Sequence, residues 1–313
     1  SYGYSFSQEL LDEWDWSEHF ASQPEILKYL EYVSEKFDLL KDIQLNSHVT
    51  SAIYEDNGPG WQLRLSDGRT YKSRFLITAI GLLSEPVMPR IEGIGTFNGP
   101  EFHTSRWPHT GVEYKNKRVA IIGTGASGVQ TIQVLVKDVE HLTVFQRRPN
   151  WCAPLHNDQI PQEEMEEIRM SYPEIFQRCH ETVAGFLHNV DSRGTFEVSG
   201  KEREEFWEEL YASRGFGIWQ GNFKDVLTNP KANREMSHFI ARKIRERVKD
   251  PETAEKLIPK DHGFGTRRVP LETKYYESYN QPNVELVDIS ESPIERVTEK
   301  GITTGGRDYE FDL

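Results

Sequence analysis

The chain has 313 residues, enough for about two domains, and its 16 phenylalanines, 13 tyrosines and 7 tryptophans can fill a sizeable hydrophobic core. Its net charge of −13 argues against a nucleic acid or an anionic membrane surface as the main partner, because phosphate groups would repel it. Two cysteines are too few for a disulfide framework, and the longest apolar run, Phe75 to Leu83, is too short to cross a bilayer, so we expect a cytoplasmic protein.

The first part of the chain is predicted to be helical and then to change to β structure. Apolar side chains recur at helical spacing over residues 8–37, with Pro24 at a plausible helix start. Strand patterns follow over residues 49–54, 61–65 and 71–80, with an Asp67-Gly68 hairpin turn before the last of them. Within that last pattern, the segment from Phe75 to Gly81 predicts a buried strand that ends in glycine.

A linker rich in proline and glycine, around residues 86–95, separates this part from a βαβ pattern. The pattern consists of a strand over 118–122, a helix over 126–137 and a strand over 141–145. Residues 155–262 are highly charged and have helical periodicity, which predicts a helical insertion. β character returns at residues 284–287 and continues towards Leu313.

A glycine-rich turn lies between the first strand and the helix of the βαβ pattern. Gly123, Gly125 and Gly128 fit the spacing G-x-G-x-x-G, in which the first glycine permits a tight turn and the second lets a pyrophosphate approach the backbone. The third lets the helix pack on the strand, and the helix N-terminus offers free N–H groups to phosphates. The residues predicted to bind the dinucleotide are Gly123, Thr124, Gly125, Ala126, Ser127, Gly128 and Gln130. The alternative is a glycine turn that binds nothing.

The second strand of the pattern ends in Gln146-Arg147-Arg148, where an NAD site usually has an aspartate or a glutamate. An acid accepts hydrogen bonds from the ribose 2′-hydroxyl but would repel a 2′-phosphate, whereas a guanidinium group pairs with a phosphate in bidentate fashion. The sequence therefore predicts NADP(H) rather than NAD(H). Solvated surface arginines are the alternative interpretation.

Residues 97–108 read F-x-G-x-x-x-H-x-x-x-W-P, and the glycine turn begins fifteen residues after this segment. The segment resembles the fingerprint of the Baeyer–Villiger monooxygenases, flavoenzymes that insert one oxygen atom beside a ketone carbonyl. The fingerprint positions are Phe97, Gly99, His103, Trp107 and Pro108. Segments at 4–7, 23–26, 145–147 and 265–271 are also similar to family segments, so the resemblance spans the whole chain.

The resemblance implies an α/β fold, with a Rossmann-like NADP-binding domain that carries a helical insertion and part of a second, FAD-binding Rossmann-like domain. Family members have another G-x-G-x-x-G, for FAD, upstream of the matching stretch, so we expect an internal fragment of a longer enzyme. The expected ranges are 1–90 for part of the FAD domain, 91–154 for the first half of the NADP domain with the fingerprint linker, 155–262 for the insertion, 263–305 for the second half of the NADP domain, and 306–313 for a strand returning to the FAD domain.

The resemblance also implies roles for individual residues. Arg268 matches the active-site arginine that holds a negatively charged flavin peroxide, and a permanently charged side chain suits that role. Arg147 matches a residue that binds the 2′-phosphate, as does Arg267, where a lysine is more usual. Arg148 stands where the family usually has a small hydroxyl residue, so its role is open.

Two further groups of residues follow from the resemblance. Val49, Ala79 and Gly81 are expected near FAD, and Leu82 and Leu83 are expected to line the substrate pocket. His103 and Trp107 are expected to couple movement of NADP(H) to catalysis. The alternative for His103 and Trp107 is a packed aromatic loop with one hydrogen-bonded histidine. The alternative for the strand that ends at Gly81 is an ordinary buried strand end.

The activity that the resemblance implies is the oxidation of a ketone by NADPH and molecular oxygen to an ester or lactone, through a C4a-peroxyflavin, with FAD and NADP(H) as cofactors and no metal. Two alternatives are open: a flavin monooxygenase that oxygenates nitrogen or sulfur, and a reductase module that uses NADPH without oxygen chemistry. The sequence identifies neither the particular ketone nor the oligomeric state.

Overall fold

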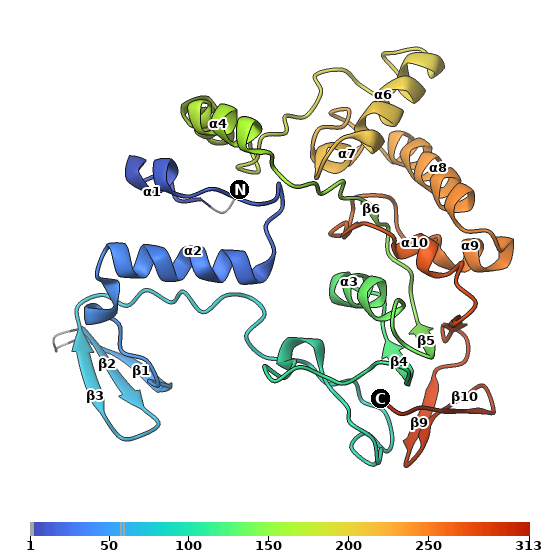
Figure 1. The fold of residues 1–313 in the computed structure, drawn as a ribbon, viewed down its shortest axis with the longest axis horizontal. Helices are drawn as coiled ribbons and strands as arrows, with labels where there is room; N and C mark the ends of the chain where they lie inside the picture. The colour runs from blue at the N-terminus through green and yellow to red at the C-terminus, as the bar shows by residue number, and fades with distance from the viewer. Residues whose placement is uncertain (1–2, 57, 59) are drawn as a thin grey trace. The chain divides into compact units, whose positions relative to one another are not determined.

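The computed structural model describes residues 3–56, 58 and 60–313 and divides into two compact units (Figure 1). The first unit comprises residues 1–86 and 159–172. The second comprises residues 87–158 and 173–313.

In the first unit, two helices precede a small antiparallel sheet, as the sequence predicts. Its elements are α1 (Gln8–Glu13), α2 (Gln23–Lys36), the 3-10 helix η1 (Leu39–Asp42), β1 (Val49–Glu55), β2 (Gly60–Leu65), β3 (Thr70–Ser73) and α4 (Gln162–Met170). Leu10, Tyr29 and Val33 form a small core with surrounding tryptophans because they lie on the facing sides of α1 and α2. The strands pair in the order β1-β2-β3, and the predicted hairpin turn contains Gly68 at φ +88°.

The prediction of a buried strand at Phe75–Gly81 is wrong. β3 ends at Ser73, and residues 74–80 belong to no helix or strand. The side chains of Phe75, Ile77 and Ile80 are between 75% and 88% exposed. A buried strand needs a hydrogen-bonded neighbour and a surface that covers it, and no strand of the described residues pairs with this segment.

The second unit contains the predicted βαβ pattern. β4 (Arg118–Ile122), β5 (His141–Gln146) and β8 (Val284–Asp288) form a parallel sheet in the order β4-β5-β8, and α3 (Ala126–Leu135) connects the first two strands. β5 is the central strand and is buried at every position after His141, which agrees with its place between two parallel neighbours. The helix and the second strand lie within two residues of their predicted ends.

Every named element between β6 and β7 is a helix, so the helical character predicted for residues 155–262 is confirmed. From β6 to α10, the second unit contains the following elements in chain order: β6 (Ala153–Pro154), α5 (Tyr172–Glu181), which begins at the boundary with the first unit, α6 (Gly200–Ala212), α7 (Gly217–Gln220), α8 (Pro230–Arg247), α9 (Pro251–Leu257), β7 (Leu271–Glu272) and α10 (Tyr275–Ser278). The main core joins this helical segment to the parallel sheet, with Leu142, Val144, Met236 and Phe239 completely buried.

The end of the chain forms an antiparallel meander of β9 (Ile294–Thr298), β10 (Gly301–Thr304) and β11 (Arg307–Glu310). The last residues run beside β4: the amide of Ala120 donates to the carbonyl of Leu313 over 2.9 Å. The Arg118 guanidinium reinforces this contact with an ion pair to Asp312, at 2.8 Å between Nη2 and Oδ1. The free edge of β4 is thus partly covered. Among the described residues, no helix combines the length and the apolar character that a bilayer span requires.

Candidate nucleotide-binding site

The glycine turn between β4 and α3 has space on its outer side. Gly123 has φ +102°, a conformation that residues with a side chain rarely adopt, and a Cβ atom added there or at Gly125 would meet nothing within 4 Å. A Cβ atom at Gly128 would lie 2.3 Å from the carbonyl oxygen of Gly123, so only glycine lets α3 approach the turn. The turn therefore leaves room for a pyrophosphate in front of the first amides of α3, which have no partner within the helix.

Buried polar side chains fix the turn to the end of β5. Thr124, only 4% exposed, donates from Oγ1 to the carbonyl of Arg148 over 3.1 Å, so its hydroxyl faces the protein and only its backbone faces the turn. Gln146, 1% exposed, donates from Nε2 to the carbonyl of Lys256 over 2.7 Å. These contacts hold the two arginines that follow Gln146 beside the glycine turn.

Two of the three arginines predicted to recognise the 2′-phosphate lie close to one carboxylate, that of Asp261. Arg148 Nη1 lies 3.9 Å from Asp261 Oδ2, and Arg267 Nη2 lies 3.3 Å from the same oxygen. The other oxygen, Oδ1, lies 2.6 Å from Nδ1 of His262. This hydrogen bond with His262 holds the pKa of Asp261 below its ordinary value, so the carboxylate is charged at neutral pH.

The loop that carries Arg267 and Arg268 is anchored to the helical segment. The indole of Trp219 donates to the carbonyl of Gly265 over 3.1 Å, and the side-chain amide of Asn233 donates from Nδ2 to the carbonyl of Phe264 over 2.8 Å. Gly265 has φ +77° and lies so close to Trp219 that a Cβ atom there would be 2.8 Å from the indole. Arg268 itself is exposed, and its carbonyl accepts a hydrogen bond of 3.3 Å from Asn150.

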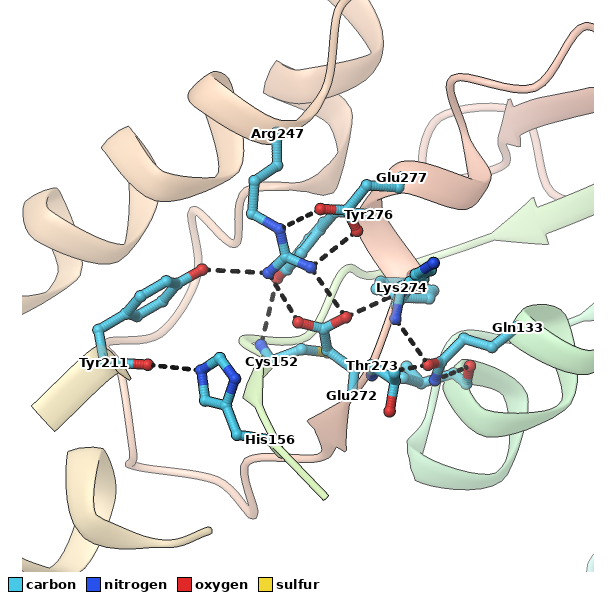
Figure 2. A network of polar contacts seen from close by, with 12 residues as sticks. Gln133, Cys152, His156, Tyr211, Arg247, Glu272, Thr273, Lys274, Tyr276 and Glu277 are labelled. Carbon is cyan, nitrogen blue, oxygen red and sulfur yellow. Dashed lines mark hydrogen bonds and ion pairs between the residues drawn. The ribbon is translucent and has the colours of Figure 1, made fainter. Parts of the chain in front are cut away.

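A partly buried ion-pair network continues the anchoring after the loop (Figure 2). Arg247 of α8 forms two hydrogen bonds to Glu272 of β7, at 2.7 and 3.0 Å, and two to Glu277 of α10, at 2.6 and 2.8 Å. The Glu272 side chain is completely buried, so this partner is needed to keep a charge there. Because Glu272 is only four residues beyond Arg268, the network fixes one end of the arginine loop.

Helix α3 is tied to the same network. The Gln133 side-chain oxygen accepts hydrogen bonds from the amides of Thr273 and Lys274, at 2.8 and 3.0 Å (Figure 2). The glycine turn at one end of α3 and the arginine loop before β7 are therefore held by a continuous set of contacts. This is how the fold positions two segments that are about 140 residues apart in the sequence.

Three fingerprint residues and the first glycine of the turn line one cavity of about 810 Å³ in the second unit. Phe97, His103 and Trp107 lie on one part of its wall, and Gly123 and Arg147 on another. Gly99 is required beside it, because a Cβ atom there would lie 2.5 Å from the ring of Phe97. The other fingerprint residue, Pro108, is half-buried directly after the exposed Trp107.

His103 has a local structural role. Its Nδ1 accepts a hydrogen bond of 3.2 Å from the amide of Ser105 and caps the short 3-10 helix η2 (Thr104–Arg106). The same atom lies 2.8 Å from the Ser105 hydroxyl. A histidine with its hydrogen bond satisfied is the structural alternative to a coupling role that the sequence left open. The residue also lines the cavity. A coupling role for His103 and Trp107 stays a prediction.

The residues predicted near FAD and the substrate all belong to the first unit. Val49 begins β1, and Ala79, Gly81, Leu82 and Leu83 lie in the exposed segment after β3. Leu82 is 99% exposed and Leu83 84%. Gly81 has φ +71° and open space where a side chain would project. The segment thus offers an apolar surface and an accessible backbone.

Asp261 and His262 were not among the residues that sequence reasoning selected. Asp261 is one of 50 acidic residues, and no motif distinguishes it from the rest. A possible signal was its place six residues before Arg267, in the same loop. The sequence also assigned no role to Gln146 beyond its place before the arginines. No group of three or more potential metal ligands occurs in the described ranges.

Comparisons with known proteins agree with this geometry. The model of the family "Pyridine nucleotide-disulphide oxidoreductase" matches residues 5–174. The chain is 46% identical, over its whole length, to a 2-oxo-Delta(3)-4,5,5-trimethylcyclopentenylacetyl-CoA monooxygenase of Pseudomonas putida and covers 58% of that protein. It is 41% identical, again over its whole length, to a cyclopentanone 1,2-monooxygenase of Comamonas, of which it covers 57%.

A solved structure of OTEMO in complex with FAD and NADP superposes with a TM-score of 0.96 at 47% identity. The match covers 99% of this chain and 59% of that one. The chain therefore spans somewhat more than half the length of the proteins that it matches.

Proposed function

The chain belongs to the pyridine nucleotide-disulphide oxidoreductase family and its homologues are Baeyer–Villiger monooxygenases, and from this premise we propose that the whole protein is a flavin monooxygenase. It uses NADPH and O₂ to insert an oxygen atom next to a ketone carbonyl and releases an ester or a lactone. The observation that carries the proposal concerns the second unit. An open glycine turn lies beside Arg147 and Arg148, and three of the fingerprint residues line the same cavity as Gly123 and Arg147.

The described residues fit NADP(H). Gly123 and Gly125 leave open space in front of the turn, and the first amides of α3 can donate to a pyrophosphate there. Arg147, Arg148 and Arg267 are exposed cations beside the turn or on the neighbouring loop, where a 2′-phosphate would be paired. An acid at the position of Arg147 would instead favour a free ribose hydroxyl, so the charge pattern supports NADP(H) over NAD(H).

FAD is the second cofactor of the proposal, and the solved OTEMO complex contains both. In the first unit, the backbone at Gly81 is open and the apolar side chains beside it are exposed, which suits contact with a flat ring system. FAD supplies oxygen activation when it is bound and has been reduced by NADPH. The protein's part is to bind, orient and stabilise charge.

Arg268 is proposed to stabilise negative charge that develops on oxygen during the reaction. An arginine cannot give up its proton at neutral pH, so it remains a cation next to a basic oxyanion. The fold supports this by fixing the backbone at the carbonyl of Arg268, through Asn150, and four residues further on, through the buried Glu272. The guanidinium group stays exposed.

A ketone on a five-membered ring is the proposed substrate class, because both relatives are named for compounds with such a ring. A cytoplasmic location is also part of the proposal. It is supported by the small number of cysteines, both of which are free thiols.

The test uses the whole protein supplied with FAD, NADPH and cyclopentanone under air. We expect NADPH oxidation that depends on ketone and oxygen, and a lactone as the product in gas chromatography with mass detection. The Arg268→Ala variant should still oxidise NADPH but should form no lactone. Oxidation of an amine or a thioether without lactone formation, or NADPH oxidation that does not require O₂, would contradict the proposal and favour one of the two alternatives from the sequence.

A further inference from the structure

Asp261 is a carboxylate that forms ion pairs with two of the three arginines that the proposed function assigns to a phosphate. Within the described part of the chain, the ion pairs of Arg148 and Arg267 both end on its Oδ2 atom, at 3.9 and 3.3 Å. The two arginines come from different segments, the end of β5 and the loop before β7. A carboxylate that attracts both of them occupies the same charges that a 2′-phosphate would use.

The position of this carboxylate is fixed by His262, through the oxygen that the arginines do not contact. Its Oδ1 atom lies 2.6 Å from Nδ1 of His262, whose side chain is only 7% exposed. The carbonyl of His262 accepts a hydrogen bond of 3.0 Å from the indole of Trp151, which is 3% exposed. Asp261 is therefore held by a buried neighbour on one oxygen and presents the other to the arginines. A flexible surface acid would lack such a support.

We propose that Asp261 is a built-in counter-ion of the 2′-phosphate site: its carboxylate competes with the phosphate for Arg148 and Arg267, and so limits the affinity for NADP(H). The inference rests on the proposed function, because it takes NADP(H) as the ligand. A 2′-phosphate between these arginines meets two attractive cations and one repulsive carboxylate. A nucleotide without the 2′-phosphate meets no such competition.

A limited affinity has a functional consequence. An enzyme that must move or release its nicotinamide nucleotide during the reaction cycle needs a phosphate site from which the nucleotide can dissociate. Here the arginines can pair with Asp261 when the phosphate leaves, so dissociation leaves no unpaired guanidinium groups. Asp261 thus affects both the preference for a 2′-phosphorylated nucleotide and the dissociation of NADP(H). Its neighbour His262 is a positioning residue that holds the carboxylate in place.

The test measures binding of 2′,5′-ADP and of ADP to the whole protein, supplied with FAD, by isothermal titration calorimetry, which requires no turnover. Removal of one negative charge near a phosphate that carries nearly two should tighten 2′,5′-ADP binding about five- to tenfold in Asp261→Asn. Binding of ADP should change by less than about twofold by the same argument. Asp261→Glu, which keeps the charge, should stay near the wild type.

Two further variants make the result specific. Asp158→Asn removes an equal charge from an exposed carboxylate that pairs with Arg214, and it should change neither affinity. Asp261→Ser is measured as well, so that the conclusion does not depend on one variant that folds poorly. Circular dichroism melting curves check that each variant is folded.

An unchanged or weaker affinity for 2′,5′-ADP in both Asp261→Asn and Asp261→Ser would overturn the inference, and so would equal tightening of both ligands. If the wild type shows no preference for 2′,5′-ADP over ADP, the assignment of NADP(H) fails, and this inference falls with it. The first two outcomes leave the proposed function intact, so the two failures can be distinguished.

Discussion

Two apolar segments of this chain have the sequence of a strand, and only one of them is a strand. Residues 118–122 form β4, which pairs with β5 on one side and contacts the last residues of the chain on the other. Residues 75–81 are at least as apolar, but they have no strand partner among the described residues and lie exposed. The comparison shows that an apolar run becomes a strand only where other parts of the chain supply hydrogen-bond partners and a covering surface.

The largest effect is expected from removal of the buried support on which the second unit depends. In Arg247→Met, Glu272 would remain as a completely buried carboxylate without its cation, which typically costs about 3–5 kcal/mol. Urea unfolding followed by circular dichroism measures the loss. Arg242→Met, on the same helix but in an exposed ion pair with Glu204, should lose less than about 1 kcal/mol. Equal losses of stability in the two variants would mean that the network in Figure 2 contributes no more than an exposed ion pair.

A matched pair of leucines tests the comparison directly. Leu142 of β5 is 0% exposed, and Leu142→Ala should lower the free energy of unfolding by about 2–5 kcal/mol through lost burial and a cavity. Leu82 is 99% exposed, and Leu82→Ala should change it by less than about 0.5 kcal/mol. Thermal melting of both variants gives the difference. A loss of several kcal/mol in Leu82→Ala would show that the segment after β3 is buried in solution.

The glycines of the turn separate packing from binding. Gly128→Ala would place Cβ against the carbonyl oxygen of Gly123, and overpacking of this kind typically costs about 1–3 kcal/mol. Gly125→Ala meets no atom of the protein, so its stability should be nearly unchanged while binding of 2′,5′-ADP weakens, because the methyl group fills the space needed by the pyrophosphate. Chemical unfolding and calorimetry measure the two effects. Normal binding by a folded Gly125→Ala variant would place the nucleotide elsewhere.

The smallest expected effect concerns the cover on the edge of β4. Hydrogen bonds from Arg118 lower the pKa of Asp312 in the folded chain. A lowered pKa means that the contribution to stability is present above the unfolded value, near pH 4, and is lost as the pH falls through the folded value. Both side chains are about 40% exposed, so this contribution should not exceed about 1 kcal/mol.

Unfolding measured from pH 7 to pH 3 tests this contribution. Asp312→Asn should reduce the stability at pH 7 and flatten its dependence on pH. An unaltered pH dependence would show that the ion pair contributes nothing measurable, and that the backbone hydrogen bonds alone hold the end of the chain beside β4.

Sequence patterns alone predict the elements whose signals are local or nearly so. The helix at Gln23–Lys36, the hairpin turn at Gly68 and the βαβ unit with its glycine turn all lie where the spacing of apolar residues, prolines and glycines predicts them. The preference for NADP(H) was likewise inferred from Arg147 and Arg148 at the end of a strand, because charge at that place has a direct chemical meaning.

Which residues from distant parts of the sequence come into contact is known only from the folded structure. It placed Asp261 between Arg148 and Arg267, and it showed that His103 caps a short helix. It also left the apolar run at Phe75–Gly81 exposed, against the prediction of a buried strand. The physical reason is the same in each case: burial, ion pairing and strand pairing depend on partners that are remote in the sequence, and a local pattern shows what a segment can do but not what it meets.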